Sequence, residues 1–224
     1  MNETNVREER KQRLFKQNKM YILKAAEIVF AQNGYSMATV DDIAREAHFS
    51  KATLYRYYKS KREIFLEIIH NTIVEARKNI RKIQQKEMTS EEKLRELSRY
   101  ILSYFYKKKN IARILYLEKF AYKKISNLKP EVKDSLPYQH PPIPGLMKNE
   151  MEEIFDIICE IINEGVKRGE FRKVNVSDAS FIFGALIRGF FLKGPVQKIV
   201  YSIDESVDLM NNFFIYGIKK ERKE

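Results

Sequence analysis

Helix-breaking residues are scarce along this chain, and their scarcity limits the folds open to it more than any other feature. The 224 residues include eight glycines and six prolines, and four of the prolines fall between Pro137 and Pro144. Elsewhere apolar residues recur at the helical spacing of three and four, and no strand-like alternation extends beyond a few residues. We therefore expect an all-α protein of about nine helices.

The chain is strongly basic, with 42 Lys and Arg, 30 Asp and Glu, and a formal net charge of +12. This balance favours a polyanionic partner, either nucleic acid or an anionic membrane surface, although an ordinary solvated basic surface has the same composition. One cysteine, Cys159, and three scattered histidines form neither a disulfide framework nor a zinc site. We expect no metal, no cofactor and a cytoplasmic protein. No segment has the length and apolarity of a membrane span or of a signal peptide.

The N-terminal part is predicted to contain an arm and a first helix. Residues 1–17 are highly charged, and we expect them to form a frayed or disordered arm. From Lys19 onward one apolar stripe keeps helical spacing, and Gly34 follows where a helix should stop. The stripe consists of Ile22, Ala25, Ala26, Val29 and Phe30.

Two shorter helices follow, each with a start signal. Thr39 and Asp42, three residues apart, have the spacing of a capping box. Ser50 can cap the next helix, which is predicted from Lys51 to about Tyr58. Two short helices joined by a tight turn need a third helix to cover them, and the helix from Lys19 supplies it. This order is typical of a helix-turn-helix module, whose second helix lies in the DNA major groove.

The helix from Lys51 has the chemistry that DNA contact needs. Leu54 and Tyr58, four residues apart, are expected to face the module core. The remaining side chains, which combine tyrosines with basic and small residues, then face outward. Such side chains suit phosphate oxygens and base edges. They are Lys51, Ala52, Thr53, Tyr55, Arg56 and Tyr57.

About 45 residues resemble the DNA-binding domain of the TetR (tetracycline-repressor-like) family in both residue type and spacing. A second stretch, at residues 165–172, resembles a turn common in the C-terminal domain of that family. The resemblance implies a DNA-binding transcriptional regulator that acts as a homodimer. The matching positions are Gly34, Thr39, Ile43, Ala44, Ala47, Ser50, Lys51, Thr53, Leu54, Tyr55, Tyr58, Lys61 and Glu63.

Two positions depart from the family pattern. His48 stands where the turn usually has glycine, and histidine tolerates a left-handed backbone at modest cost. Tyr58 replaces a phenylalanine, so we expect its hydroxyl to reach solvent or a partner.

Carried over position by position, the resemblance implies specific roles in DNA binding. Thr39 and Lys61 would anchor phosphates on either side of the groove. Arg56 would add a phosphate contact, and Tyr57 would touch the DNA backbone. The residues that would face bases or nearby phosphates are Lys51, Ala52, Thr53 and Tyr55.

We expect three segments: the arm at 1–17, the DNA-binding domain at 18–62, and an effector-binding and dimerisation domain at 63–224. One helix is predicted from Ser60 to about Gln85, across the start of the third segment. Further helices of that segment are predicted from Thr89 and over about 110–126, 146–169, 177–193 and 203–220. A proline-rich loop is predicted from Leu128 to Gly145.

The helix at 177–193 is apolar nearly all round, so it must be buried on every side. We expect one side to face its own subunit and the other a two-fold partner, together with the last helix. A symmetric dimer implies a palindromic operator. The predicted interface residues are Phe181, Gly184, Ala185, Arg188, Gly189, Met210, Phe213 and Phe214.

The central helices are rich in aromatic residues, and the family resemblance implies a pocket there for a small, mostly apolar effector. Arg188, within an apolar run, needs a partner, which is either an Asp or Glu or an acidic effector. We expect a repressor released by its effector. The alternative is a DNA-binding protein controlled by a protein partner, or an architectural one; no motif indicates an enzyme. The predicted pocket residues are Tyr100, Tyr104, Phe105, Tyr116, Phe120, Phe155 and Arg188.

Overall fold

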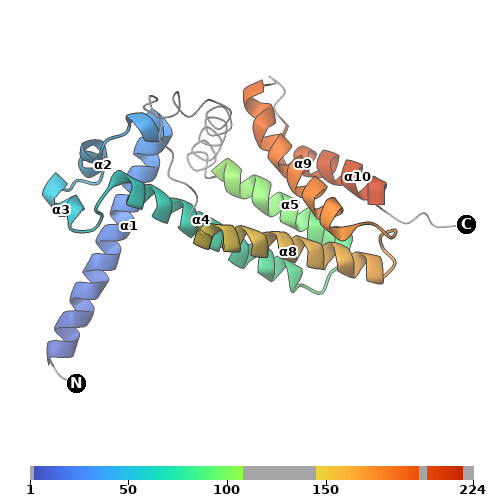
Figure 1. Cartoon of the computed structure of the whole chain (residues 1–224), viewed down its shortest axis with the longest axis horizontal. Helices are drawn as coiled ribbons and strands as arrows, with labels where there is room; N and C mark the ends of the chain where they lie inside the picture. The colour runs from blue at the N-terminus through green and yellow to red at the C-terminus, as the bar shows by residue number, and fades with distance from the viewer. Residues whose placement is uncertain (1–2, 108–144, 197–200, 219–224) are drawn as a thin grey trace, which may run out of the picture. The chain divides into compact units, whose positions relative to one another are not determined.

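The computed structural model is all-helical over the residues that it describes, which are 3–107, 145–196 and 201–218 (Figure 1). The predicted helix at 110–126 and the proline-rich loop before Gly145 lie outside these ranges. The helices described are α1 (Glu3–Met37), α2 (Val40–Glu46), α3 (Lys51–Tyr55), α4 (Lys61–Gln84), α5 (Ser90–Lys107), α8 (Gly145–Lys167), α9 (Val176–Val196) and α10 (Ile203–Ile218).

The chain divides into two compact units, with the boundary inside α4. Of the described residues, unit 1 contains 3–71, and unit 2 contains 72–107, 145–196 and 201–218. We expected the division after residue 62, at the start of α4, whereas the units divide after residue 71, nine residues further along this helix.

The first turns of α4 explain this difference. Ile64, Phe65 and Ile68 are all buried. The Phe65 ring packs edge-on against Phe30 of α1, with the ring centroids 5.8 Å apart. The beginning of α4 therefore forms part of the core of unit 1, which a boundary drawn at a capping signal does not detect.

Helix α1 is the longest helix of unit 1, and it corrects one expectation. Its predicted apolar stripe is buried, from Ile22 to Phe30. Gly34 has a φ of 73° and interrupts the helix where a stop was predicted. The described helix begins at Glu3, however, so the prediction of a frayed or disordered arm over residues 1–17 was wrong for residues 3–17. Residues 5–17 are exposed, yet they are helical for two reasons. Glu, Arg, Lys and Gln are good helix formers, and the packed part of α1 that follows removes the cost of helix nucleation.

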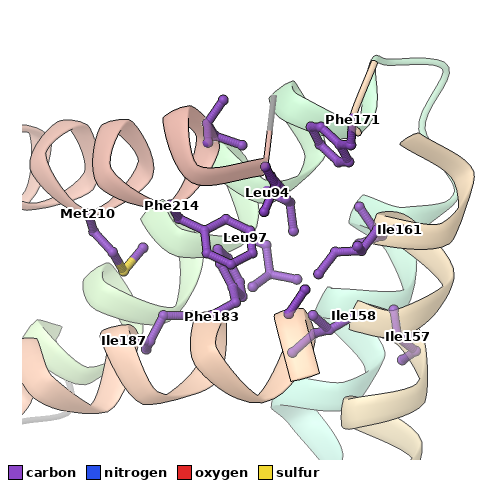
Figure 2. Close-up of a cluster of buried hydrophobic side chains, with 14 of the residues drawn as sticks. Leu94, Leu97, Ile157, Ile158, Ile161, Phe171, Phe183, Ile187, Met210 and Phe214 are labelled. Atoms are coloured by element: carbon purple, nitrogen blue, oxygen red, sulfur yellow. The ribbon is translucent and has the colours of Figure 1, made fainter. Parts of the chain in front are cut away.

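Unit 2 is organised around one apolar cluster, to which α5, α8, α9 and α10 all contribute (Figure 2). Leu97 of α5 and Ile161 of α8 are fully buried in it. The rings of Phe183 on α9 and Phe214 on α10 lie 5.1 Å apart and join these two helices. Each of these four helices therefore buries one apolar face within the unit.

One buried ion pair links α5 to α8 beside this cluster. The Lys93 side chain is 5% exposed, and its Nζ lies 2.8 Å from Oε2 of Glu164. The hydrogen bond from Lys93 holds the pKa of Glu164 below its usual value. A buried ammonium is tolerated only with such a partner, so this pair fixes which faces of α5 and α8 meet.

The end of α8 and the turn after it require glycine at two positions. A Cβ at Gly165 would lie 2.3 Å from the Phe171 ring and 2.9 Å from the Cβ of Ser90. Gly169 has a φ of 73°, which a larger residue adopts only with strain. The stretch at 165–172 is thus a tight turn that lets Phe171 close over the end of α8.

Helix α9 is only partly covered by its own unit. Phe183 and Ile187 are buried, whereas Phe181 and Ile182 are 62% and 52% exposed. In the described ranges, no helix combines the length and the apolarity needed to cross a membrane.

Candidate nucleic-acid interface

The start of α2 is fixed by a capping box, as the sequence predicted. The Thr39 Oγ1 accepts a hydrogen bond from the backbone N–H of Asp42 at 3.1 Å. The Asp42 carboxylate in turn accepts from the Thr39 backbone N–H at 3.0 Å and from its hydroxyl at 2.6 Å. These hydrogen bonds lower the pKa of Asp42. Because the Thr39 hydroxyl proton is directed to Asp42, a phosphate contact by Thr39 would compete with this cap, and that role stays a prediction.

The turn between α2 and α3 has the geometry expected at His48. This residue has a φ of 57°, in the left-handed region that glycine usually fills. The Phe49 backbone N–H donates to the Ala44 carbonyl at 2.9 Å, which closes the turn. Ser50 then caps α3, its Oγ accepting from the Thr53 N–H at 3.1 Å. A backbone turn and a side-chain cap therefore fix the direction in which α3 leaves.

Helix α3 presents one open face. Leu54 is fully buried, as predicted, and anchors the helix. The helix ends at Tyr55 rather than near Tyr58, since the backbone N–H groups of Arg56 and Tyr57 donate to carbonyls only three residues back. Of the predicted DNA-contacting residues, those fully on the exposed side are Lys51, Ala52, Tyr55 and Arg56.

Two of the residues predicted to contact DNA also make contacts within unit 1. Thr53 is half-buried, and its hydroxyl lies 2.8 Å from that of Ser50. The Tyr57 ring stacks on Phe15 with centroids 4.8 Å apart, and its hydroxyl accepts from Asn18 Nδ2 at 2.8 Å. Sequence reasoning missed Phe15 and Asn18, because both lie at the edge of a stretch too charged to suggest packing.

Lys61 has a structural role that the sequence did not indicate. Its Nζ donates to the carbonyls of Tyr35 and Ala38, both at 2.7 Å, and of Ser36 at 3.2 Å. The ammonium also lies 4.6 Å from the centroid of the Tyr35 ring. An ammonium has three N–H donors, and all three have carbonyl acceptors here. Lys61 thus holds the segment between α1 and α2, and its role as a phosphate anchor stays a prediction that competes with these bonds.

Lys51 pairs with an acidic residue on the neighbouring helix. Its Nζ lies 2.8 Å from Oδ2 of Asp41, and both side chains are 53% exposed. The hydrogen bond to Asp41 raises the pKa of Lys51. An exposed ion pair contributes little to stability, so Lys51 can exchange this carboxylate for a DNA phosphate at small cost.

Tyr58 corrects another expectation. We expected its hydroxyl to reach solvent or a partner, but the residue is 1% exposed in the core of unit 1, and its hydroxyl has no hydrogen-bond partner among the described residues. Burial, with a further contribution from the charge of Glu67, raises the pKa of this phenol. Lys19 lies 4.8 Å from the Tyr58 ring centroid and 2.8 Å from Glu67 Oε2. The departure from phenylalanine is thus accommodated beside a charged pair between α1 and α4.

The predicted effector residues are only partly brought together. The Tyr100 and Tyr104 rings lie 5.9 Å apart on α5. Tyr104 donates to Glu75 Oε2 at 3.0 Å, and Asn79 Nδ2 donates to the Tyr100 hydroxyl at 3.1 Å. Phe155 is half-buried on α8. The side chains of Phe105, Tyr116 and Phe120 lie outside the described residues.

Two residues predicted for the dimer interface need correction, and a third stays a prediction. Arg188 is exposed in the single subunit, 5.8 Å from the centroid of the Phe181 ring, so its pairing with an Asp or Glu or with an acidic effector stays a prediction. Met210 and Phe214 were assigned to the interface but are 1% and 5% exposed, inside the core of unit 2. The sequence pattern of α10 did not separate its inner face from its outer one, because Phe213 and Tyr216 on the exposed side lie next to the buried Phe214 and Ile215.

No cluster of three or more metal-binding side chains occurs in the part of the chain that the structure describes. The geometry of unit 1 instead defines a helix-turn-helix protein with a short, capped and outward-facing second helix. Such a module belongs to DNA-binding transcriptional regulators.

Comparison with known proteins specifies the family. Residues 22–68 match the family described as bacterial regulatory proteins, tetR family. The transcriptional regulator QacR of Staphylococcus aureus is 28% identical over 206 residues, which are 89% of this chain and 97% of that protein. A fatty acid metabolism regulator of Bacillus subtilis is 31% identical over 75 residues, 34% of this chain and 39% of that protein. By the family match, residues 22–68 form a DNA-binding domain of the tetR family of regulatory proteins.

Solved structures share the fold over nearly the whole chain. FadR from Bacillus subtilis, in complex with stearoyl-CoA, has a TM-score of 0.69 and 20% identity, covering 89% of this chain and 98% of that chain. A transcriptional regulator from Saccharomonospora viridis, in complex with choline, has a TM-score of 0.73 and 21% identity, covering 92% of this chain and 100% of that chain. An N-terminal DNA-binding module followed by a helical domain is thus the architecture of this protein.

The role of Lys61 can be measured as stability. Replacing it by methionine (Lys61→Met) leaves three carbonyls without their cationic donor, and we expect a loss of about 2 kcal/mol in the free energy of unfolding. Lys59→Met is the matched control, since Lys59 is exposed, and it should change stability by less than about 0.5 kcal/mol. Equal stabilities of the two variants in urea unfolding would show that Lys61 is not structural.

Proposed function

We propose that this protein is a cytoplasmic repressor that binds a palindromic operator as a homodimer and is released by a small effector bound in unit 2. The observation that carries the DNA-binding part is the open face of α3. Leu54 holds the helix to unit 1, while Lys51, Tyr55 and Arg56 stay exposed on its outer side. A helix that keeps polar and aromatic side chains in water next to a well-packed core fits the major groove.

The exposed residues of α3 and of the position after it are suited to two different kinds of DNA contact. Arg56 and Lys51 are suited to phosphate oxygens, which position the protein without reading sequence. Ala52 and Tyr55 are suited to base edges and thymine methyl groups, which carry the sequence information. The half-buried Thr53 keeps its place through Ser50, so it would contact bases only near the start of the helix.

A dimer is supported by the apolar side chains that unit 2 leaves uncovered on α9 and α10. Phe181 is 62% exposed, Phe213 is 74% exposed and Tyr216 is 79% exposed. Ala185 and Gly189 lie among the surface residues of α9, where small side chains allow close approach of a second helix. A two-fold axis through this face would bury all of these residues and pair the two α3 helices on one palindrome.

An effector site in unit 2 is supported by the aromatic pair on α5. Tyr100 packs against the apolar cluster, and the polar ends of Tyr100 and Tyr104 are held by Asn79 and Glu75 of α4. This arrangement offers apolar ring surface with polar groups at one edge, as small-molecule sites generally do. The stearoyl-CoA and choline complexes of structurally similar regulators add support, because they place ligands in proteins of this fold.

The protein would be released from its operator if the effector binds more tightly to an arrangement of the two DNA-binding modules that does not fit the operator. A coupling of about 1–3 kcal/mol changes operator affinity by roughly five- to 150-fold. By linkage, the operator weakens effector binding by the same factor. Control by a protein partner or an architectural role predicts instead that small ligands leave operator affinity unchanged.

The assigned face of α3 can be tested with two tyrosines of similar exposure. Tyr55 on α3 is 47% exposed and Tyr21 on α1 is 49% exposed. We expect Tyr55→Ala to weaken binding to an operator selected from genomic fragments by about tenfold to a hundredfold, since it removes a base contact. Tyr21→Ala should bind as the wild type does. Unchanged affinity of the Tyr55 variant in fluorescence anisotropy would refute the assignment.

The dimer can be tested by placing a charge on the uncovered apolar face. Phe213→Glu should give a monomer in sedimentation and lose most operator affinity, because a carboxylate buried in an apolar interface has no partner. Met151→Glu is the control: Met151 is 52% exposed on α8, and its variant should remain dimeric. A Phe213→Glu protein that sediments as a dimer would place the interface elsewhere.

A further inference from the structure

The first half of α1 contributes nothing to the core. Every residue from Asn5 to Gln17 is exposed, and the buried stripe starts only at Ile22. We call residues 5–17 the α1 extension. An isolated helix of this length is marginal in water, and here it persists as the continuation of a packed helix. An ordered segment whose residues are all exposed is available to a partner.

The C-terminal end of the α1 extension lies beside the end of α3. The Phe15 ring stacks on Tyr57 at 4.8 Å, two residues after the end of α3. Asn18 donates to the Tyr57 hydroxyl at 2.8 Å. The ring of Phe49, in the turn before α3, has its centroid 6.5 Å from that of Tyr57. These contacts tie the extension to the same small group of residues that positions α3.

The charge of the α1 extension is strongly positive. It contains five basic and two acidic residues. Arg7, Arg10 and Arg13 recur every three residues, so they form one row on the helix surface. At a rise of about 1.5 Å per residue, this row extends roughly 9 Å along the helix axis, a length over which a DNA strand presents about two or three phosphates.

We propose that the α1 extension is a second DNA-contacting element, which binds phosphates beside the groove that α3 occupies. The inference rests on the proposed function, since it requires that α3 engages duplex DNA. The arginine row would contact the backbone without reading sequence, and the Phe15–Tyr57 stack would hold the row in place relative to α3. The operator would then be protected over a longer stretch than α3 alone covers.

The distribution of apolar residues favours DNA over a membrane surface. A helix that lies on a membrane needs one apolar face opposite a basic one. In the α1 extension, Val6 and Leu14 are about half exposed and occupy the same side as the arginine row, while Phe15 faces Tyr57. The apolar residues therefore form no separate face for lipid.

The test compares two triple variants of the full chain that lose the same charge. Arg7→Ala/Arg10→Ala/Arg13→Ala removes the row, and Lys78→Ala/Lys167→Ala/Lys173→Ala removes three exposed lysines of unit 2. Operator affinity is measured between 50 and 200 mM salt, with thermal unfolding and sedimentation as checks on fold and dimer. Each lost phosphate contact reduces the slope of log affinity against log salt by about 0.9.

We expect the arginine variant to lose at least tenfold in affinity at the lower salt and at least one unit of slope, while the lysine variant keeps the wild-type slope. Phe15→Ala, which keeps the charges but removes the stack, should lose part of the affinity. A wild-type slope in the arginine variant would overturn the inference, and so would loss only of binding to phosphatidylserine vesicles. Failure of the wild type to bind any duplex would instead refute the proposed function.

Discussion

The burial of Leu54 and Tyr58 against the rest of unit 1 is the interaction on which this protein depends. Helix α3 has five residues, too few to be stable alone, and Leu54 is its one buried side chain. Because this anchor and the fully covered Tyr58 ring fix the helix, the cap at Ser50 can determine its direction. The exposed face of α3 is therefore a consequence of packing on its opposite side.

Charged side chains also hold the elements of unit 1 together. Lys61 closes the segment after Gly34 by donating to three carbonyls, and Lys19 lies between Glu67 and the Tyr58 ring. Helix α1 is the common support, since it provides the buried stripe for the core and, through Phe15 and Asn18, contacts with Tyr57. The elements that position α3 thus also connect it to the α1 extension.

Much of the fold could be predicted from local signals. The capping box at Thr39, the cap at Ser50, the stop at Gly34 and the left-handed turn at His48 are encoded by neighbouring residues, and the structure has each of them. The inner and outer faces of α9 and α10 could not be separated, because apolar residues lie on nearly all sides of α9 and exposed aromatic residues lie beside buried ones in α10. Met210 and Phe214 were therefore assigned to an interface although they are core residues. The partners of Lys61 and Tyr57 come from positions 23 to 42 residues away, which spacing does not reveal.

We propose that two copies of α3 bind one palindrome. Selection of genomic fragments with the purified full-length protein, followed by a footprint of the enriched DNA, tests this proposal. We predict one shared inverted repeat, protected on both half-sites, with their centres one or more helical turns apart. Enrichment of no common sequence, or protection of a single asymmetric site, would contradict it.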